Sequence, residues 1–82
     1  MSQHEKLAAA FKACAGPYPY RDLQRLLTAL GYVESSGKGS ARRFYNSALD
    51  HLILLHEPHP GNTIHLYMVR QIRTKLEDKG LL

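Results

Sequence analysis

The chain has 82 residues, enough for one domain with a modest core and too few for a Rossmann pair, a TIM barrel or a multi-site enzyme. Apolar residues make up 44% and charged residues 22%, a composition that excludes an intrinsically disordered chain. The net charge of +4 favours an anionic partner: nucleic acid first, an acidic protein second and a membrane surface third.

Two amphipathic helices are predicted in the first third of the chain. The first covers about residues 3–15, because apolar side chains recur three and four positions apart before a glycine-proline pair ends the pattern. The second follows Tyr18-Pro19-Tyr20 with the same spacing, and Gly31 is suited to end it. The apolar positions are Leu7, Ala10, Phe11 and Cys14 in the first helix, and Leu23, Leu26, Leu27 and Leu30 in the second.

The period then changes to the alternation that is typical of strands. Strands are predicted over residues 32–34, 41–46 and 52–56, and the Gly- and Ser-rich run 35–40 forms the turn between the first two. Three short strands in this order indicate an antiparallel meander. Alternation in the second strand groups Arg42, Phe44 and Asn46 on the core side, and Ala41, Arg43 and Tyr45 on the other.

The last predicted element is a helix that begins at Ile64 or Tyr67 and ends at Lys79, with Gly80 beyond its end. Residues 57–62 before it cannot be regular, because two prolines and a glycine interrupt them. The predicted order is therefore ααβββα in a single domain over residues 1–82. This is an α+β fold in which a three-stranded antiparallel sheet packs against helices on one face. The other face is open, which suits the docking of RNA on a basic domain.

Cysteine and histidine usage limits the sites that the chain can build. Cys14 is the only cysteine, which excludes an intrachain disulfide and a cysteine-based zinc site, and it is expected to be a small buried side chain. His4, His51 and His65 are isolated in polar surroundings and are expected at the surface. One cysteine, a polar N-terminus and no long apolar run predict a cytoplasmic protein without a signal peptide or a membrane span.

The basic, glycine-rich segment 37–44 is the first candidate for function. Lys38, Arg42 and Arg43 bring three positive charges, and Arg42 lies near the end of its strand, from where it can reach solvent. Ser40 and the backbone N–H of Gly39 can donate hydrogen bonds to a phosphate. The structural alternative is a solvated hairpin with basic side chains and no ligand.

The segment His56-Glu57-Pro58-His59-Pro60-Gly61 is the second candidate. Histidine titrates near neutral pH, so a histidine beside a phosphate can act as general base or general acid. RNA cleavage needs a base for the 2′-OH proton, a cation for the phosphorane and an acid for the 5′-oxygen. His56 and His59 lie three residues apart at a strand end and can face one site. The alternatives are a histidine that only bonds the turn, and a metal site that lacks a clear further ligand nearby.

Taken together, four features resemble the HicA toxins of HicA–HicB type II toxin–antitoxin pairs. They are Leu26-Leu27-x-x-Leu30-Gly31, Gly37-x-Gly39-Ser40, His56-x-Pro58-His59-Pro60-Gly61 and a C-terminal helix that ends at Gly80, all within residues 20–82. The resemblance implies a fold similar to a double-stranded-RNA-binding domain, extended here by the N-terminal helix. It also implies an mRNA endonuclease (an mRNA interferase) and a HicB-type antitoxin that covers the active face.

One position departs from the family's usual pattern, in which a catalytic histidine follows Gly-Ser. Ala41 stands there in this chain, and alanine can neither take nor donate a proton. Three explanations are open. In the first, a natural subgroup of the family uses other residues for catalysis. In the second, the histidine was replaced by alanine so that a toxic protein could be produced. In the third, the protein binds RNA without cutting it.

If other residues carry the catalysis, the resemblance points to His56 as general base or acid and to His59 as the second proton-transfer group. Contacts to RNA and its phosphates are then expected from Lys38, Gly39, Ser40, Arg42, Arg43 and Tyr45, the last by stacking on a base. The competing classes are a non-catalytic RNA-binding module and a protein-interaction domain whose basic face meets an acidic partner. No metal, cofactor or membrane is expected to take part.

Overall fold

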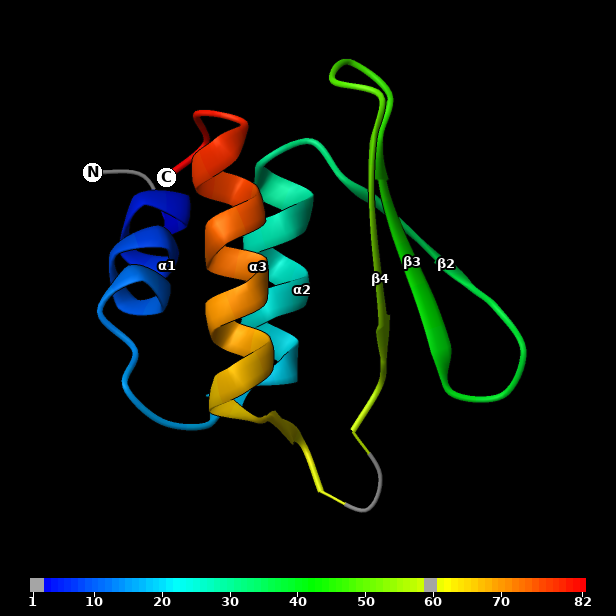
Figure 1. Ribbon diagram of the computed structural model, residues 1–82, viewed down its shortest axis with the longest axis horizontal. Coiled ribbons are helices and arrows are strands. Elements are labelled where there is room, and N and C mark those ends of the chain that lie inside the picture. Colours follow the sequence, from blue (N-terminus) through cyan, green and yellow to red (C-terminus); the bar gives the residue numbers. More distant parts are fainter. Residues whose placement is uncertain (1–2, 59–60) are drawn as a thin grey trace.

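Helices and a three-stranded antiparallel sheet form this α+β structure, a computed structural model that describes residues 3–58 and 61–82 (Figure 1). Along the chain, the elements are α1 (Gln3–Lys12), β1 (Tyr18–Pro19), α2 (Tyr20–Ala29), β2 (Val33–Ser36), β3 (Ala41–Asn46), β4 (His51–His56), β5 (Thr63–Ile64) and α3 (Leu66–Asp78). From α2 to α3, the main elements follow the order αβββα of a double-stranded-RNA-binding domain, which confirms the predicted fold class. Within the described residues, no helix has the length and apolar character of a membrane span.

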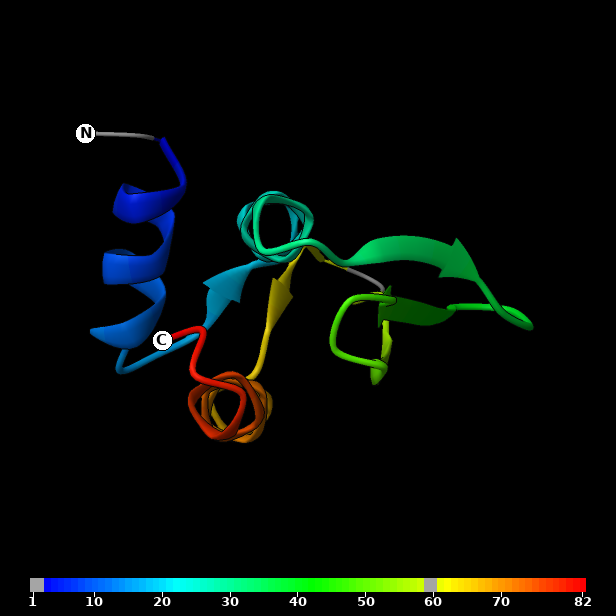
Figure 2. The ribbon, with the colours of Figure 1, turned by 90° about the horizontal axis from the view of Figure 1, so that it is seen from above.

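The elements form three layers (Figure 1, Figure 2). α1 lies on one side, α2 and α3 lie in the middle on either side of the short strands β1 and β5, and β2, β3 and β4 form the sheet on the other side. β3 is the central strand, and its Phe44 lies opposite Glu34 of β2 and Ile53 of β4. Phe44, Ile53 and Leu55 are buried, whereas the side chains between them on these strands are exposed. One sheet face is therefore covered and the other is open, as the sequence predicted.

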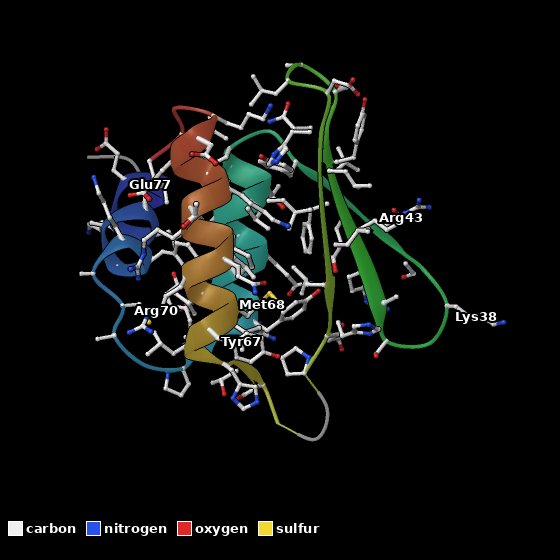
Figure 3. The ribbon with its side chains drawn as sticks, in the orientation of Figure 1. Lys38, Arg43, Tyr67, Met68, Arg70 and Glu77 are labelled. Carbon is white, nitrogen blue, oxygen red and sulfur yellow. The ribbon has the colours of Figure 1, made fainter. Side chains whose placement is uncertain are left out.

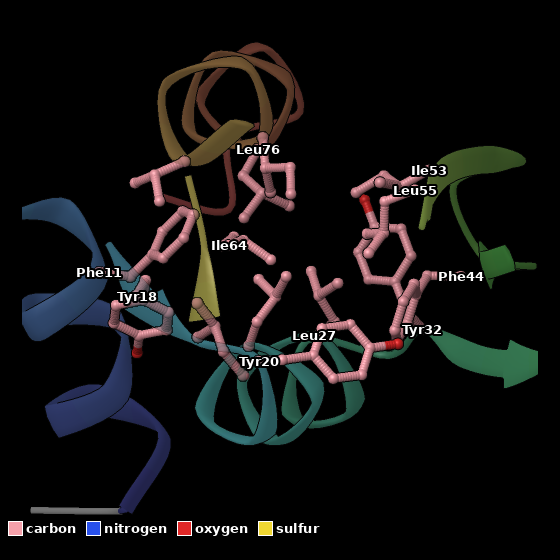
Figure 4. Packing of buried hydrophobic residues seen from close by; sticks show 14 residues of the cluster. Phe11, Tyr18, Tyr20, Leu27, Tyr32, Phe44, Ile53, Leu55, Ile64 and Leu76 are labelled. Atoms are coloured by element: carbon pink, nitrogen blue, oxygen red, sulfur yellow. The ribbon is translucent and has the colours of Figure 1, made fainter. Parts of the chain in front are cut away.

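The core lies between the sheet and the middle helices and continues toward α1 (Figure 4). From α1, Phe11 packs edge-to-face on Tyr18 with ring centroids 5.0 Å apart. Burial of each large apolar side chain contributes about 1.5–3 kcal/mol, so this cluster holds the layers together. Cys14 is only partly buried, at the edge of the core. The buried positions of the middle helices follow the predicted spacing: Leu23, Leu26 and Leu27 in α2, and Val69, Ile72 and Leu76 in α3.

Both middle helices end in the same hydrogen-bonded motif around a glycine. At the end of α2, the N–H of Gly31 donates to the carbonyl of Thr28 at 3.1 Å, and the N–H of Tyr32 donates to that of Leu27 at 2.9 Å. The end of α3 repeats this pattern around Gly80. The φ of Gly31 is 102° and that of Gly80 is 73°, values that glycine adopts without steric cost. The predicted helix ends at these glycines are confirmed.

α1 ends at Lys12, about three residues before the predicted end. Arg73 of α3 accounts for this difference, because its Nη2 donates to the carbonyls of Phe11 at 3.2 Å and Cys14 at 2.7 Å. Carbonyls at a helix C-terminus have no partner within the helix, and the guanidinium binds one of them, that of Phe11, together with the Cys14 carbonyl just beyond the helix. The apolar periodicity runs past this point, so the sequence alone places the helix end too late.

Two short strands were not predicted. β1 and β5 pair antiparallel, with Tyr18 opposite Ile64. Ile64 therefore belongs to a strand, and α3 begins two residues later, at Leu66. Strands of two residues leave no alternation that a sequence pattern could show. The first strand of the main sheet also starts later than predicted, at Val33, because the N–H of Tyr32 is still bonded to the Leu27 carbonyl at the end of α2.

His51 corrects the prediction that three isolated histidines lie at the surface. It is half-buried on the helix-facing side of β4, where its Nδ1 is hydrogen-bonded to the hydroxyl of Tyr32. Burial lowers the pKa of His51, and the charges of Lys79 and Lys75 lower it further. His65 is exposed as expected, and the side chain of His4 lies outside the described part of the structure.

Candidate functional site

His56 and Ser40 form a hydrogen-bonded pair at one end of the sheet. His56 is the last residue of β4, and the strand register places it opposite Ala41, the first residue of β3. Ser40 Oγ lies 3.2 Å from His56 Nδ1, and the N–H of Glu57 donates to the Ser40 carbonyl at 2.9 Å. Both side chains of the pair are exposed. The contact engages Nδ1 and leaves Nε2 as the ring nitrogen for proton transfer.

The turn before β3 adjoins this pair. The N–H of Gly37 donates to the Ala41 carbonyl at 2.8 Å, and the N–H of Ala41 donates to the Lys38 carbonyl at 3.1 Å. Gly39 has a φ of 62°, a conformation that favours glycine. Lys38 is exposed at the tip of the turn and points away from the helices (Figure 3). The turn therefore brings a cation and a hydroxyl to the end of the sheet that carries the imidazole.

Arg43 and Tyr45 lie on the open face of the sheet, as strand alternation predicted. Arg43 is exposed, lies opposite Ser35 of β2 and Leu54 of β4, and points away from the helices (Figure 3). The hydroxyl of Tyr45 donates to Asp50 Oδ1 at 2.7 Å, and this hydrogen bond raises the pKa of Tyr45. The same face also exposes three apolar side chains: Val33, Leu52 and Leu54.

Arg42 points to the opposite side of β3 from Arg43. Its Nε donates to Glu57 Oε1 at 3.2 Å and lies 4.0 Å from Glu34 Oε2. Its Nη1 donates to the carbonyls of Gly39 and Ala41. Arg42 therefore ties the turn before β3 to β2 and to the segment after β4. Sequence reasoning missed both glutamates, although alternation already places Arg42 on the side away from the open face.

A pocket with a volume of about 360 Å³ lies beside His56, between the end of β4 and the start of α3. The rings of His65 and Tyr67 are stacked there, with centroids 5.8 Å apart and planes inclined by 16°. Figure 3 shows Tyr67 and Met68 at this end of α3. Sequence reasoning missed the pocket, because its walls come from three different elements and the segments between them. Its described lining residues are His56, Glu57, Pro58, Thr63, Ile64, His65, Tyr67 and Met68.

This geometry can be compared with known families. A family model described as the HicA toxin of bacterial toxin-antitoxin matches residues 20–81. The chain belongs to the HicA toxin family. The match confirms the resemblance seen in the sequence motifs, and it shows that the chain is a toxin of the toxin–antitoxin type. No curated protein and no solved structure matches the chain.

All predicted site residues lie within the part of the chain that matches the HicA model. The structure brings some of them together and separates others. Ser40 and His56 are in contact, with Lys38 and Gly39 in the adjoining turn. Arg43 and Tyr45 lie further along the same open face, whereas Arg42 lies on the other side. His59 lies outside the described residues. Within the described part of the HicA domain, no three His, Cys, Asp or Glu side chains converge as a metal site would require.

Proposed function

We propose that this HicA-family toxin is an endoribonuclease that cleaves mRNA by metal-independent acid–base chemistry. The observation that carries the proposal is the Ser40–His56 pair. Its imidazole stands opposite Ala41, the position at which the family's usual pattern has a catalytic histidine. The chain therefore keeps a histidine at this end of the sheet, on the neighbouring strand. A cytoplasmic location, where mRNA is found, is part of the same proposal.

In the proposed reaction, a general base takes the proton from the ribose 2′-OH, and the 2′-oxygen attacks the adjacent phosphorus. The bond between phosphorus and the 5′-oxygen breaks, and a general acid gives that oxygen a proton. The products are a 2′,3′-cyclic phosphate and a 5′-hydroxyl. His56 is one of the two proton-transfer groups. His59 is the other, an assignment that rests on the family segment His56-x-Pro58-His59-Pro60-Gly61 alone.

The surrounding residues position RNA and stabilise charge in this scheme. Lys38 and Arg43 neutralise negative charge on the phosphate, and Ser40 with the amide of Gly39 holds a non-bridging oxygen. Tyr45 stacks on a base of the bound RNA. Arg42 was expected to bind phosphate, but its bonds to Glu57 and two carbonyls support a positioning role for the turn.

A HicB-type antitoxin is the protein partner in this proposal. The open face of the sheet supports the proposal, because it exposes Val33 and Leu52 on either side of Tyr45, and Leu54 opposite Arg43. A group of exposed apolar side chains with polar residues at its edge is typical of a surface that another protein covers. A partner that covered this face would also close access to His56, which lies at its edge.

RNA cleavage in excess EDTA tests the function directly. The wild-type chain is expected to cleave single-stranded RNA and to leave 2′,3′-cyclic phosphate ends. His56→Ala should lower the cleavage rate by about 10²–10⁴-fold, because it removes a general acid or base. His4→Ala, a histidine substitution on α1, is the matched control and should leave the rate unchanged. An unchanged rate for His56→Ala would remove this residue from the mechanism, and loss of cleavage in EDTA would contradict metal independence.

Ala41 favours a second candidate function, a toxin that binds RNA and does not cut it. In that case the wild-type chain would retain RNA and release no cleaved product. Ala41→His then separates two explanations, because residue 41 is only half-buried and can carry a larger side chain. Recovered cleavage would identify a disabled nuclease, and retained binding without cleavage would identify a binding module.

A further inference from the structure

The pocket beside His56 has a chemistry that the catalytic scheme does not use. Its volume of about 360 Å³ lies at the small end of the range for small-molecule sites, which suits one planar ring system. Ile64, Pro58 and Met68 give it an apolar lining, and Thr63 and His65 add polar groups. We propose that this pocket holds one nucleobase of a bound RNA, next to the phosphate at His56.

Ring stacking favours a base in this pocket. Tyr67 lies in the first turn of α3 and keeps 61% of its surface exposed. Its ring is held nearly parallel to that of His65. A fixed, exposed aromatic ring is the platform on which proteins stack the unpaired bases of single-stranded RNA.

The charges of the pocket favour a base over a phosphate. None of the described lining residues is a lysine or an arginine. The one carboxylate, Glu57, is paired with Arg42 at 3.2 Å, so it does not repel an RNA chain at full strength. An uncharged ring with a polar edge matches this lining. The phosphates of the same strand are matched instead by Lys38 and Arg43 on the adjoining turn and sheet face.

The position of the pocket indicates which nucleotide of the RNA would place its base there. His56 both lines the pocket and bonds Ser40. A base in the pocket would therefore belong to a nucleotide next to the cleaved bond, and it would hold the backbone against the imidazole. This assignment to the substrate rests on the proposed function, whereas the affinity of the pocket for a base does not.

Binding of free nucleotides tests the pocket without any need for cleavage. The ¹⁵N-labelled chain is titrated with each of the four nucleoside 5′-monophosphates, and with ribose 5-phosphate as the control that lacks a base. Amide signals of Ile64, His65, Tyr67 and Met68 are expected to shift with at least one nucleotide and not with ribose 5-phosphate. Equal shifts with ribose 5-phosphate, or no shifts with any nucleotide, would overturn the proposal.

Substitution of the stacking ring gives the second readout. Tyr67→Ala should weaken nucleotide binding by about 5- to 100-fold, the loss expected when one base–aromatic stack is removed. Tyr67→Phe keeps the ring and should keep the affinity. Gln71→Ala, at an exposed position of the same helix, is the matched control. Equal affinities for Tyr67→Ala and the wild type would contradict the stacking role, provided that thermal unfolding shows both chains folded.

A cleavage assay with an abasic RNA separates failure of the pocket from failure of the nuclease. Tyr67→Ala should slow cleavage of intact RNA. With an RNA that lacks the base next to the cleaved bond, Tyr67→Ala and the wild type should cleave at the same rate. RNA cleavage without nucleotide binding would overturn the pocket and leave the nuclease standing. Nucleotide binding without RNA cleavage would overturn the nuclease and leave the pocket standing.

Discussion

At the scale of single residues, Ala41 and His56 decide where an imidazole can act. Residues opposite each other in antiparallel strands have Cβ atoms about 4.5–5.5 Å apart on the same face of the sheet. A side chain at residue 56 therefore reaches much of the space that a histidine at residue 41 would occupy. Under the proposed function, the catalytic imidazole lies one strand away from its place in the usual family pattern, and Ser40 is adjacent to both positions.

His51 is a different kind of histidine, because it is part of the core side of the sheet. Burial raises the pKa of Tyr32, and the Tyr32 hydroxyl is hydrogen-bonded to His51 Nδ1. The charges of Lys75 in α3 and of Lys79 at the C-cap of that helix oppose a positive charge on His51.

The lowered pKa of His51 predicts that acid destabilises the fold. The unfolded chain takes up a proton at residue 51 near pH 6.5, the ordinary value, and the folded chain does so only at lower pH. The stabilising contribution of His51 is therefore complete above about pH 6.5 and decreases as the pH falls through that value. In thermal unfolding, His51→Gln should show a smaller loss of Tm on acidification than the wild type. His65→Gln, at an exposed position, should keep the wild-type loss, and an equal loss for His51→Gln would contradict this account.

At the scale of elements, the glycines that end α2 and α3 have the same backbone role in different surroundings. A Cβ added at Gly31 would lie 3.2 Å from Asn46 Nδ2, whereas a Cβ at Gly80 would meet open space. Asn46 is buried, and its Nδ2 donates to the Leu30 carbonyl at the end of α2. A side-chain hydrogen bond thus joins the end of α2 to β3. At the end of α3, none of the described side chains lies where the Cβ of residue 80 would be.

This difference predicts unequal costs for the same substitution. Gly80→Ala should lower the free energy of unfolding by about 1–2 kcal/mol, the cost of a left-handed conformation for a residue with a Cβ. Gly31→Ala should cost about 1 kcal/mol more, because the Asn46 amide must also shift from its hydrogen bond. Urea unfolding of the two variants beside the wild type measures both values. Equal losses would show that Asn46 adapts to the added Cβ without cost.

The sequence predicts those elements whose own pattern is strong. The spacing of Leu23, Leu26 and Leu27 and the glycine at residue 31 determine α2, and alternation gives β3 its bounds and the side on which Phe44 lies. The end of α1 depends on Arg73, which is 59 residues away from Cys14 along the chain. No local pattern can show a boundary that a distant side chain sets.

The candidate site, too, can be predicted only where a local sequence pattern determines it. The residue types at positions 38–40 and 56 are enough to indicate phosphate binding and proton transfer. The contact between Ser40 and His56 depends on the strand register, which the sequence does not determine for two strands joined by a weak turn. The pocket around Tyr67 depends on β5, whose two residues show no pattern.

At the scale of the whole molecule, apolar and charged side chains occupy different parts of the surface. The open face of the sheet is apolar around Arg43, and the turn at its end carries Lys38 next to His56 and Ser40. Under the proposed function, the net charge of +4 would act on RNA through a few cations near the candidate site. In the same proposal the antitoxin covers the apolar part of this face, so RNA and the antitoxin would compete for one side of the molecule.

The salt dependence of RNA binding tests this distribution of charge. Each phosphate contact to single-stranded RNA contributes about 0.7 to the slope of log affinity against log salt concentration, because binding releases counterions. Lys38→Gln/Arg43→Gln should therefore reduce that slope by about 1.4. Lys12→Gln/Arg25→Gln removes the same charge from exposed positions on α1 and α2 and should leave the slope unchanged. If both double variants reduced the slope equally, the attraction would come from net charge alone, and the cations near His56 would have no special part in binding RNA.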